Sequence, residues 1–183
     1  MPHDPHSVLI RRALPADAAA ITRVRVATWK SAYAGLVPAA FLDDMHSDDP
    51  IAVARMTARV APDAPTRGFV AAVDGAVVGF VTAGPERDHP RAHPARELHP
   101  QRAEVFAVYV LPQHQGRGIG RRLLDTAGGW LRRTGATEYV LWVLDGNVAA
   151  RDFYARHGLT ETGRRQEIDL GGIVDEREYR LVL

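Results

Sequence analysis

The stretch EVFAVYVLPQHQGRGIG, residues 104–120, decides the fold. Its first half is an apolar run that predicts a strand over 104–111, and the apolar stripe that follows predicts a helix over 118–134. Glycines between the two elements allow a tight turn and let an anion approach bare backbone N–H groups at the start of the helix. Three arginines lie nearby, Arg117, Arg121 and Arg122. The segment therefore predicts a cradle for a phosphate or pyrophosphate.

Two common glycine-rich phosphate motifs do not fit this turn. A P-loop needs a lysine after its last glycine, and the only lysine of the chain is Lys30. A dinucleotide fingerprint needs a glycine five positions after its first, and counting from Gly116 or Gly118 gives another residue. The pattern that remains is Gln-x-x-Gly-x-Gly, at Gln115, Gly118 and Gly120.

The rest of the chain surrounds this segment with alternating elements. Asp74-Gly75 between two apolar runs predicts a hairpin with a type I′ turn. The apolar run over 138–144 predicts a strand buried on both faces. Strands are expected at 8–12, 69–73, 76–82, 104–111, 138–144, 160–169 and 173–182. Helices are expected at 15–34, in two pieces up to residue 60, and at 118–134 and 148–157. The order predicts one mixed α/β domain over residues 1–183.

Composition excludes several kinds of protein. The 183 residues contain no cysteine, which excludes disulfides, thiolate metal sites and a cysteine nucleophile. The 23 basic and 22 acidic residues give no charge-based case for nucleic acid. No apolar stretch reaches the roughly 18 residues of a membrane span. The first residues lack the apolar core of a secretory signal, so a cytoplasmic location without a membrane partner is expected.

A second block, NVAARDFYARHGL at residues 147–159, holds the only asparagine of the chain. Its pattern is Asn-x-x-Ala-x-x-Phe-Tyr-x-x-x-Gly-Leu. Together with the glycine turn, it resembles the GNAT superfamily of acyl-CoA-dependent N-acyltransferases; Leu159 stands where that motif usually has Phe. The resemblance implies a mixed central sheet of about seven strands flanked by about four helices. It also implies that the parallel strands 104–111 and 138–144 splay apart to form an acetyl-CoA cleft.

The resemblance implies roles for particular residues. Backbone groups near Val108 and Val110 would hold the pantetheine arm and the thioester, and Asn147 would bond to the same arm. Tyr154 would protonate the leaving thiolate, and Glu104, lying against Phe106 and Val108, would remove the proton of the amine directly or through water. The pyrophosphate would be held by Gln115, Gly116, Arg117, Gly118, Gly120 and Arg121.

Each of these functional roles has a purely structural alternative. Tyr154 could be a core aromatic, although its helical offset from Phe153 favours Phe153 in the core and Tyr154 in the cleft. Glu104 could be a solvated carboxylate at a strand start. Asn147 fits an N-cap of the following helix as well as a cofactor contact. Trp29 and Tyr33 share a helix face and are equally core residues or a wall of the acceptor site.

The loop over 86–102 contains His89, His93 and His99. Prolines alternate with these histidines, which argues against a common ligand face, so a surface loop is expected and no metal site.

The sequence thus favours an acetyl-CoA-dependent N-acetyltransferase that acts on a primary amine of a small molecule or a protein. In the absence of cysteine, the amine is expected to attack directly in a ternary complex. The alternative is a non-catalytic acyl-CoA sensor, and a nucleic-acid-binding domain is a third, disfavoured reading. Dimers are common in the superfamily, so a homodimer is compatible with the sequence. Nothing in the residues selects an acceptor or an acyl chain beyond acetyl.

Overall fold

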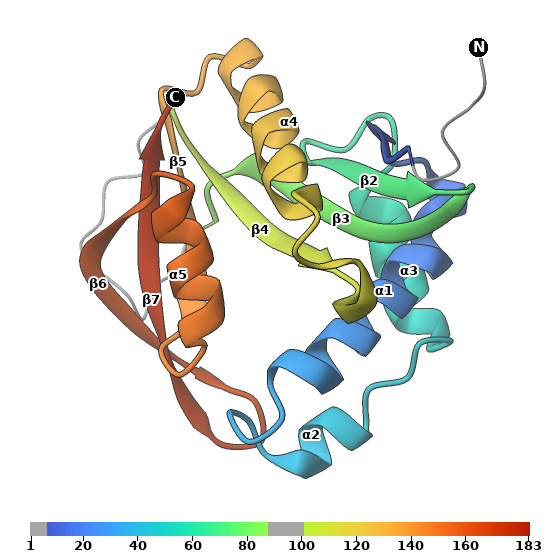
Figure 1. The fold of residues 1–183 in the computed structure, drawn as a ribbon, viewed down its shortest axis with the longest axis vertical. Helices are drawn as coiled ribbons and strands as arrows, with labels where there is room; N and C mark the ends of the chain where they lie inside the picture. The colour runs from blue at the N-terminus through green and yellow to red at the C-terminus, as the bar shows by residue number, and fades with distance from the viewer. Residues whose placement is uncertain (1–6, 88–100) are drawn as a thin grey trace.

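The computed structural model describes residues 7–87 and 101–183. Within them, seven strands form one mixed sheet in the order β1-β2-β3-β4-β5-β7-β6 (Figure 1). The strands are β1 (Leu9–Arg12), β2 (Arg67–Val73), β3 (Ala76–Pro85), β4 (Arg102–Val110), β5 (Glu138–Leu144), β6 (Thr160–Asp169) and β7 (Ile173–Val182). The α-helices are α1 (Ala18–Ala32), α2 (Ala39–Asp43), α3 (Pro50–Arg59), α4 (Ile119–Arg133) and α5 (Val148–Arg156). The expected mixed sheet is confirmed. The described residues hold five α-helices rather than about four.

Helices cover both faces of the sheet. On one face α4 packs against β2, β3 and β4, and its apolar stripe is buried in the largest core cluster. On the other face α1 and α3 pack against each other (Figure 1). Side chains of both helices join those of β2 and β3 in a second core cluster. None of the helices in the described residues is both long and apolar enough to span a membrane.

Local sequence signals explain several element boundaries. Asp74 and Gly75 have φ of 50° and 80°, as the predicted type I′ hairpin requires. Asp49 accepts a hydrogen bond from the backbone N–H of Ile51 at 2.9 Å, which caps α3. Gly135, with φ of 92°, follows the last turn of α4 and ends that helix.

The predicted splay between β4 and β5 is confirmed. The two strands are the only parallel neighbours among those described, and they pair in register only at Arg102–Glu138, Ala103–Tyr139 and Glu104–Val140. Beyond Glu104 and Val140 they diverge. On its other side β5 pairs with antiparallel β7 along its whole length, from residue 138 to residue 144.

A bulge in β4 changes which side chains face which helix layer. Thr82 of β3 pairs with Ala107 and Ala83 pairs with Val105, so Phe106 is an extra residue without a register partner. Before the bulge Val105 faces the α4 core; after it Ala107 and Tyr109 pack on the α1 and α3 side instead. Simple alternation along β4 predicts the opposite for Ala107 and Tyr109.

Candidate active site

A cavity of about 490 Å³ lies where β4 and β5 diverge. Residues 105–110 of β4 line one side, and residues 141–143 of β5 line the other. The cavity brings together most of the residues that the sequence predicts to bind acetyl-CoA: Val108, Val110, Gln115, Gly116, Gly118, Gly120, Arg121, Asn147 and Tyr154. Arg117 is an exception, because it is exposed and is not among the lining residues.

One end of the cavity is closed by the glycine turn before α4. Gly116 and Gly118 have φ of 73° and 74°, and nothing lies within 4 Å of the place where a Cβ would stand. Glycine is therefore needed for the backbone conformation there. Gly118 is the N-cap of α4, whose first N–H groups lack partners within the helix. A positive-φ turn leading into a helix start suits a pyrophosphate.

Gly120 is a glycine for a different reason. A Cβ at this position would lie 3.2 Å from Cζ of Phe153 on α5. The absence of a side chain thus lets the start of α4 pack against α5. Phe153 lines the cavity as well as packing on the core, and Tyr154 is the more buried of the two. The expected placement, with Phe153 in the core and Tyr154 in the cleft, therefore agrees with the structure, although each residue also has the other contact.

The position of Asn147 is compatible with both of the roles that the sequence left open. Its Oδ1 accepts a hydrogen bond from the backbone N–H of Ala150 at 3.1 Å, which caps α5. The residue also lines the cavity. The amide NH₂ group of the same side chain can therefore serve a ligand while the oxygen caps the helix.

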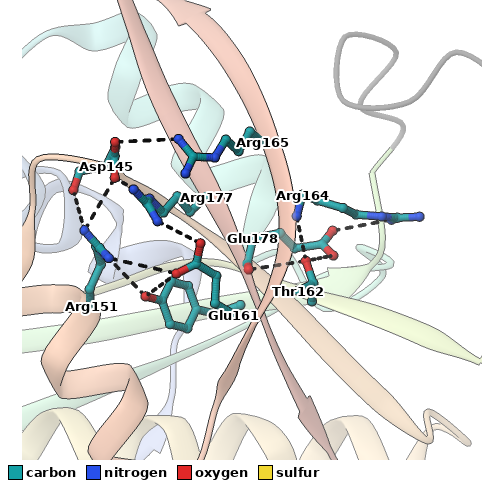
Figure 2. Close-up of polar contacts among 9 residues, drawn as sticks. Asp145, Arg151, Glu161, Thr162, Arg164, Arg165, Arg177 and Glu178 are labelled. Carbon is teal, nitrogen blue, oxygen red and sulfur yellow. Dashed lines mark hydrogen bonds and ion pairs between the residues drawn. The ribbon is translucent and has the colours of Figure 1, made fainter.

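Figure 2 shows an ion-pair network around Asp145, which stands two residues before Asn147 in the sequence. Asp145, at the end of β5, accepts from Nε of Arg177 on β7 and lies 3.4 Å from Nη1 of Arg151 on α5. Arg177 also donates to Glu161 of β6 at 2.9 Å. The hydrogen bond from Arg177 holds the pKa of Asp145 below its usual range. The network thereby joins β5, α5 and the β6–β7 hairpin behind the cavity.

Tyr154 projects from α5 to the cavity and is only 9% exposed. Burial raises the pKa of its hydroxyl well above the usual value, with smaller contributions from Tyr109 and Tyr139. The phenol therefore keeps its proton at neutral pH and can donate it.

Glu104 lies in a second, smaller cavity of about 110 Å³ on the α1 side of β4. It is fully buried, which excludes the solvated carboxylate. Arg87 holds it: the backbone N–H of Arg87 donates at 3.0 Å, its Nε lies 3.1 Å from Oε1, and its Nη2 donates as well. Phe106 and Tyr109 line the same cavity, whereas the expected neighbour Val108 does not. The bulge at Phe106 accounts for this difference.

Trp29 and Tyr33 share a face, as predicted, with ring centroids 4.7 Å apart. Both line the smaller cavity, and Tyr33 also packs in a core cluster with Leu42. The hydroxyls of Tyr33 and Tyr109 lie 3.4 Å apart. The two alternatives for this pair, core and cavity wall, therefore hold together.

Besides two aliphatic residues, Leu144 and Ile168, sequence reasoning missed four charged or aromatic residues of the smaller cavity: Arg87, Tyr109, Trp142 and Glu176. Tyr109 needs knowledge of the bulge, and the other three come from separate segments. The loop with His89, His93 and His99 lies outside the described residues. Among residues 7–87 and 101–183, no group of three or more His, Asp or Glu is arranged to hold a metal ion.

The glycine turn before α4, the diverging strands β4 and β5 and the buried Tyr154 match the arrangement that the resemblance to the GNAT superfamily implies. The family model of the acetyltransferase (GNAT) family matches residues 29–159. The chain belongs to this family. It is 31% identical to aminoglycoside N(6′)-acetyltransferase type 1 of Stenotrophomonas maltophilia, over 85% of this chain and 88% of that protein.

Solved structures share the fold. PaiA N-acetyltransferase from Thermoplasma acidophilum, in complex with coenzyme A, superposes with a TM-score of 0.71 at 19% identity, covering 96% of this chain and 99% of that one. YncA from Salmonella typhimurium, solved with acetyl-CoA, superposes with a TM-score of 0.70 at 25% identity, covering 97% and 94%. These related structures hold coenzyme A or its acetyl thioester.

Proposed function

We propose that this chain is an N-acetyltransferase that moves the acetyl group of acetyl-CoA to a primary amine in a ternary complex. The observation that carries the proposal is that the two cavities adjoin, since they share four lining residues, Tyr33, Phe106, Tyr109 and Trp142. The large cavity has the anion cradle at one end and Tyr154 on its wall, and Phe106 lines both this cavity and the smaller one around Glu104. A thioester in the first and an amine in the second would meet beside Phe106.

The binding roles follow the lining of the large cavity. Backbone N–H groups over residues 115–121, from Gln115 through Gly116, Gly118 and Gly120 to Arg121, would hold the pyrophosphate, with the exposed Arg117 as an outer charge. Backbone groups of Val108 and Val110 and the amide of Asn147 would hold the pantetheine arm. Because β4 lacks a strand partner on this side beyond Glu104, its backbone groups there can face a ligand; the carbonyl of Val110 also accepts from Nε2 of Gln115 at 2.9 Å.

The reaction forms a C–N bond and breaks a C–S bond. Glu104 takes the proton of the amine through a water, since Arg87 contacts both carboxylate oxygens. A backbone N–H near Val108 stabilises the oxyanion. Tyr154 gives its proton to the departing thiolate. The chain has no cysteine, so no cysteinyl acyl-enzyme forms.

The test is a panel of primary amines with acetyl-CoA as donor, scored by release of free CoA and by mass of the acetylated product. Calorimetry measures acetyl-CoA binding in parallel. We expect binding and release with at least one class of amine. Tight binding of acetyl-CoA with no release for any amine would support the non-catalytic acyl-CoA sensor instead.

A further inference from the structure

Three arginines from separate segments gather around the smaller cavity. Arg59 of α3 and Arg87 after β3 both stand over the ring of Phe106, with Cζ at 5.6 Å and 4.8 Å from its centroid. Arg25 of α1 stands over the ring of Trp29 at 5.9 Å. Phe106 and Trp29 both line the smaller cavity. Arg87 lines this cavity itself, whereas Arg25 and Arg59 stand over rings that line it without being lining residues.

The cluster has few negative partners. Arg87 is held by Glu104. For Arg25 and Arg59, no ion pair with an acidic side chain exists within the described residues, and Nε of Arg25 is buried there without a hydrogen bond. Burial and then the like charges of Arg87 and Arg25 lower the pKa of Arg59, and the carboxylate of Glu104 acts in the opposite direction. Like charges held this close destabilise the fold, and an anion between them would remove the repulsion.

The same cavity also suits an amine. The rings of Trp29, Tyr33 and Tyr109 form one part of its wall, and Glu104 and Glu176 contribute carboxylates. Aromatic faces and carboxylates both attract an ammonium group. A volume of about 110 Å³ accommodates the amine end of a small molecule, with the arginines beside it.

We propose that the acceptor is a small amine that also carries an anionic group, as an amino acid does, and that Arg25 and Arg59 bind this anionic group. The proposal rests on the proposed function, since it assigns the acceptor of the same site. The guanidinium groups would orient the acceptor so that its amine points past Phe106 toward the thioester. A polycationic amine such as an aminoglycoside would meet the arginines unfavourably.

The experiment compares matched acceptors that differ in one charge. The panel holds L-amino acids, the corresponding amino-acid amides, the decarboxylated amines and kanamycin. Binding to the CoA-loaded protein is measured by calorimetry, and turnover by CoA release. Loss of one charge-assisted contact corresponds to about a 10- to 100-fold change, so at least one amino acid should exceed its amide by that factor in affinity and in kcat/KM.

Variants assign the effect to the cluster. Arg59→Gln should raise the KM of the amino acid by about 10-fold or more and leave the KM of the amide and the Kd of acetyl-CoA unchanged. Arg55→Gln is the matched control, because Arg55 is an exposed arginine one turn earlier on α3. Arg59→Lys should restore part of the affinity.

The outcomes separate this proposal from the proposed function. Binding of amino acids but not amides, without turnover, would support the anion site and contradict the transferase activity. The anion site would be overturned by equal use of amino acids and their amides, by a preference for kanamycin, or by no binding of any amino acid. Turnover of other amines in these cases would still support the transferase activity. An equal loss for acid and amide in Arg59→Gln would show a structural role and overturn it as well.

Discussion

The two sides of β5 differ sharply, although they belong to one strand. Toward β7 every residue from 138 to 144 has a register partner, and toward β4 only three do. The paired side is reinforced by the network around Asp145 and Arg177. The unpaired side opens into the large cavity.

This difference shows how a sheet can hold a binding cleft without losing rigidity. A strand that lost partners on both sides would move, and its side chains would lose their positions. Because β7 fixes β5 along its length, the groups on the open side stay in place for a ligand. Variants on the side of β5 that faces β4 should therefore change the chemistry, and variants on the side that faces β7 should change the stability.

The largest effect is expected for Tyr154→Phe on the open side. Under the mechanism proposed above, loss of the Tyr154 hydroxyl should lower kcat by about 100- to 10,000-fold, while the Kd of acetyl-CoA stays nearly unchanged. Steady-state kinetics and calorimetry measure the two quantities. Tyr179→Phe is the control, since the Tyr179 ring packs 6.2 Å from that of Tyr154 but its hydroxyl contacts Arg151 and Glu161. Equal losses in both variants would argue against the acid role.

The next effect concerns the glycine turn. Gly118→Ala places a side chain at φ of 74°, which costs about 1 kcal/mol or more and should raise the Kd of acetyl-CoA by about 10-fold. Gly118→Asn should be milder, because asparagine tolerates this conformation. Gly135→Ala, at φ of 92° beyond the other end of α4, should lower the melting temperature without changing acetyl-CoA affinity. An unchanged affinity in Gly118→Ala would remove the turn from the binding site.

A smaller effect is expected at the contact between the start of α4 and Phe153 of α5. Gly120→Ala puts a Cβ 3.2 Å from Phe153, which should cost about 1 kcal/mol of stability and a few-fold in kcat. Adding Phe153→Leu should recover most of the stability, because the smaller side chain vacates the contact. Double-mutant analysis of thermal unfolding measures the coupling. Purely additive effects would contradict the packing explanation.

The smallest effect is expected on the paired side. Asp145 has a lowered pKa through Arg177, so its contribution to stability is present above the unfolded-state pKa of about 3.9 and disappears as pH falls through the lower folded-state value. Asp145→Asn should lower the melting temperature at about pH 7, and the difference from the parent should shrink below about pH 4. Asp152→Asn, exposed on α5, is the control. A pH-independent difference would show that the charge is irrelevant.

Local signals made most of the fold predictable. The strands at 138–144, 160–169 and 173–182 have the predicted bounds. An apolar run defines the first, and nearby glycines, Gly158 and Gly171-Gly172, delimit the other two. The cleft residues near the two motifs could likewise be predicted from the sequence, since each motif places its residues on one short segment.

Features that depend on contacts between distant segments could not be predicted from the sequence. The bulge at Phe106 exists only through pairing with β3, and the grouping of Arg25, Arg59 and Arg87 needs the packing of α1 and α3. The three glycines of the turn looked equivalent in sequence. In the structure, two serve the backbone conformation and Gly120 serves the contact with Phe153.

The extra residue at Phe106 makes the backbone register of β4 a determinant of which side chains reach the smaller cavity. If the same residues ran in strict alternation, with no bulge, Ala107 and Tyr109 would lie in the layer under α4 and Val108 would take the opposite face. Deleting Phe106 alone would remove the bulge but keep the pairs Val105–Ala83 and Ala107–Thr82, so Tyr109 would stay on its present side. A one-residue deletion there would therefore remove Phe106 from the walls of both cavities and leave Tyr109 in place.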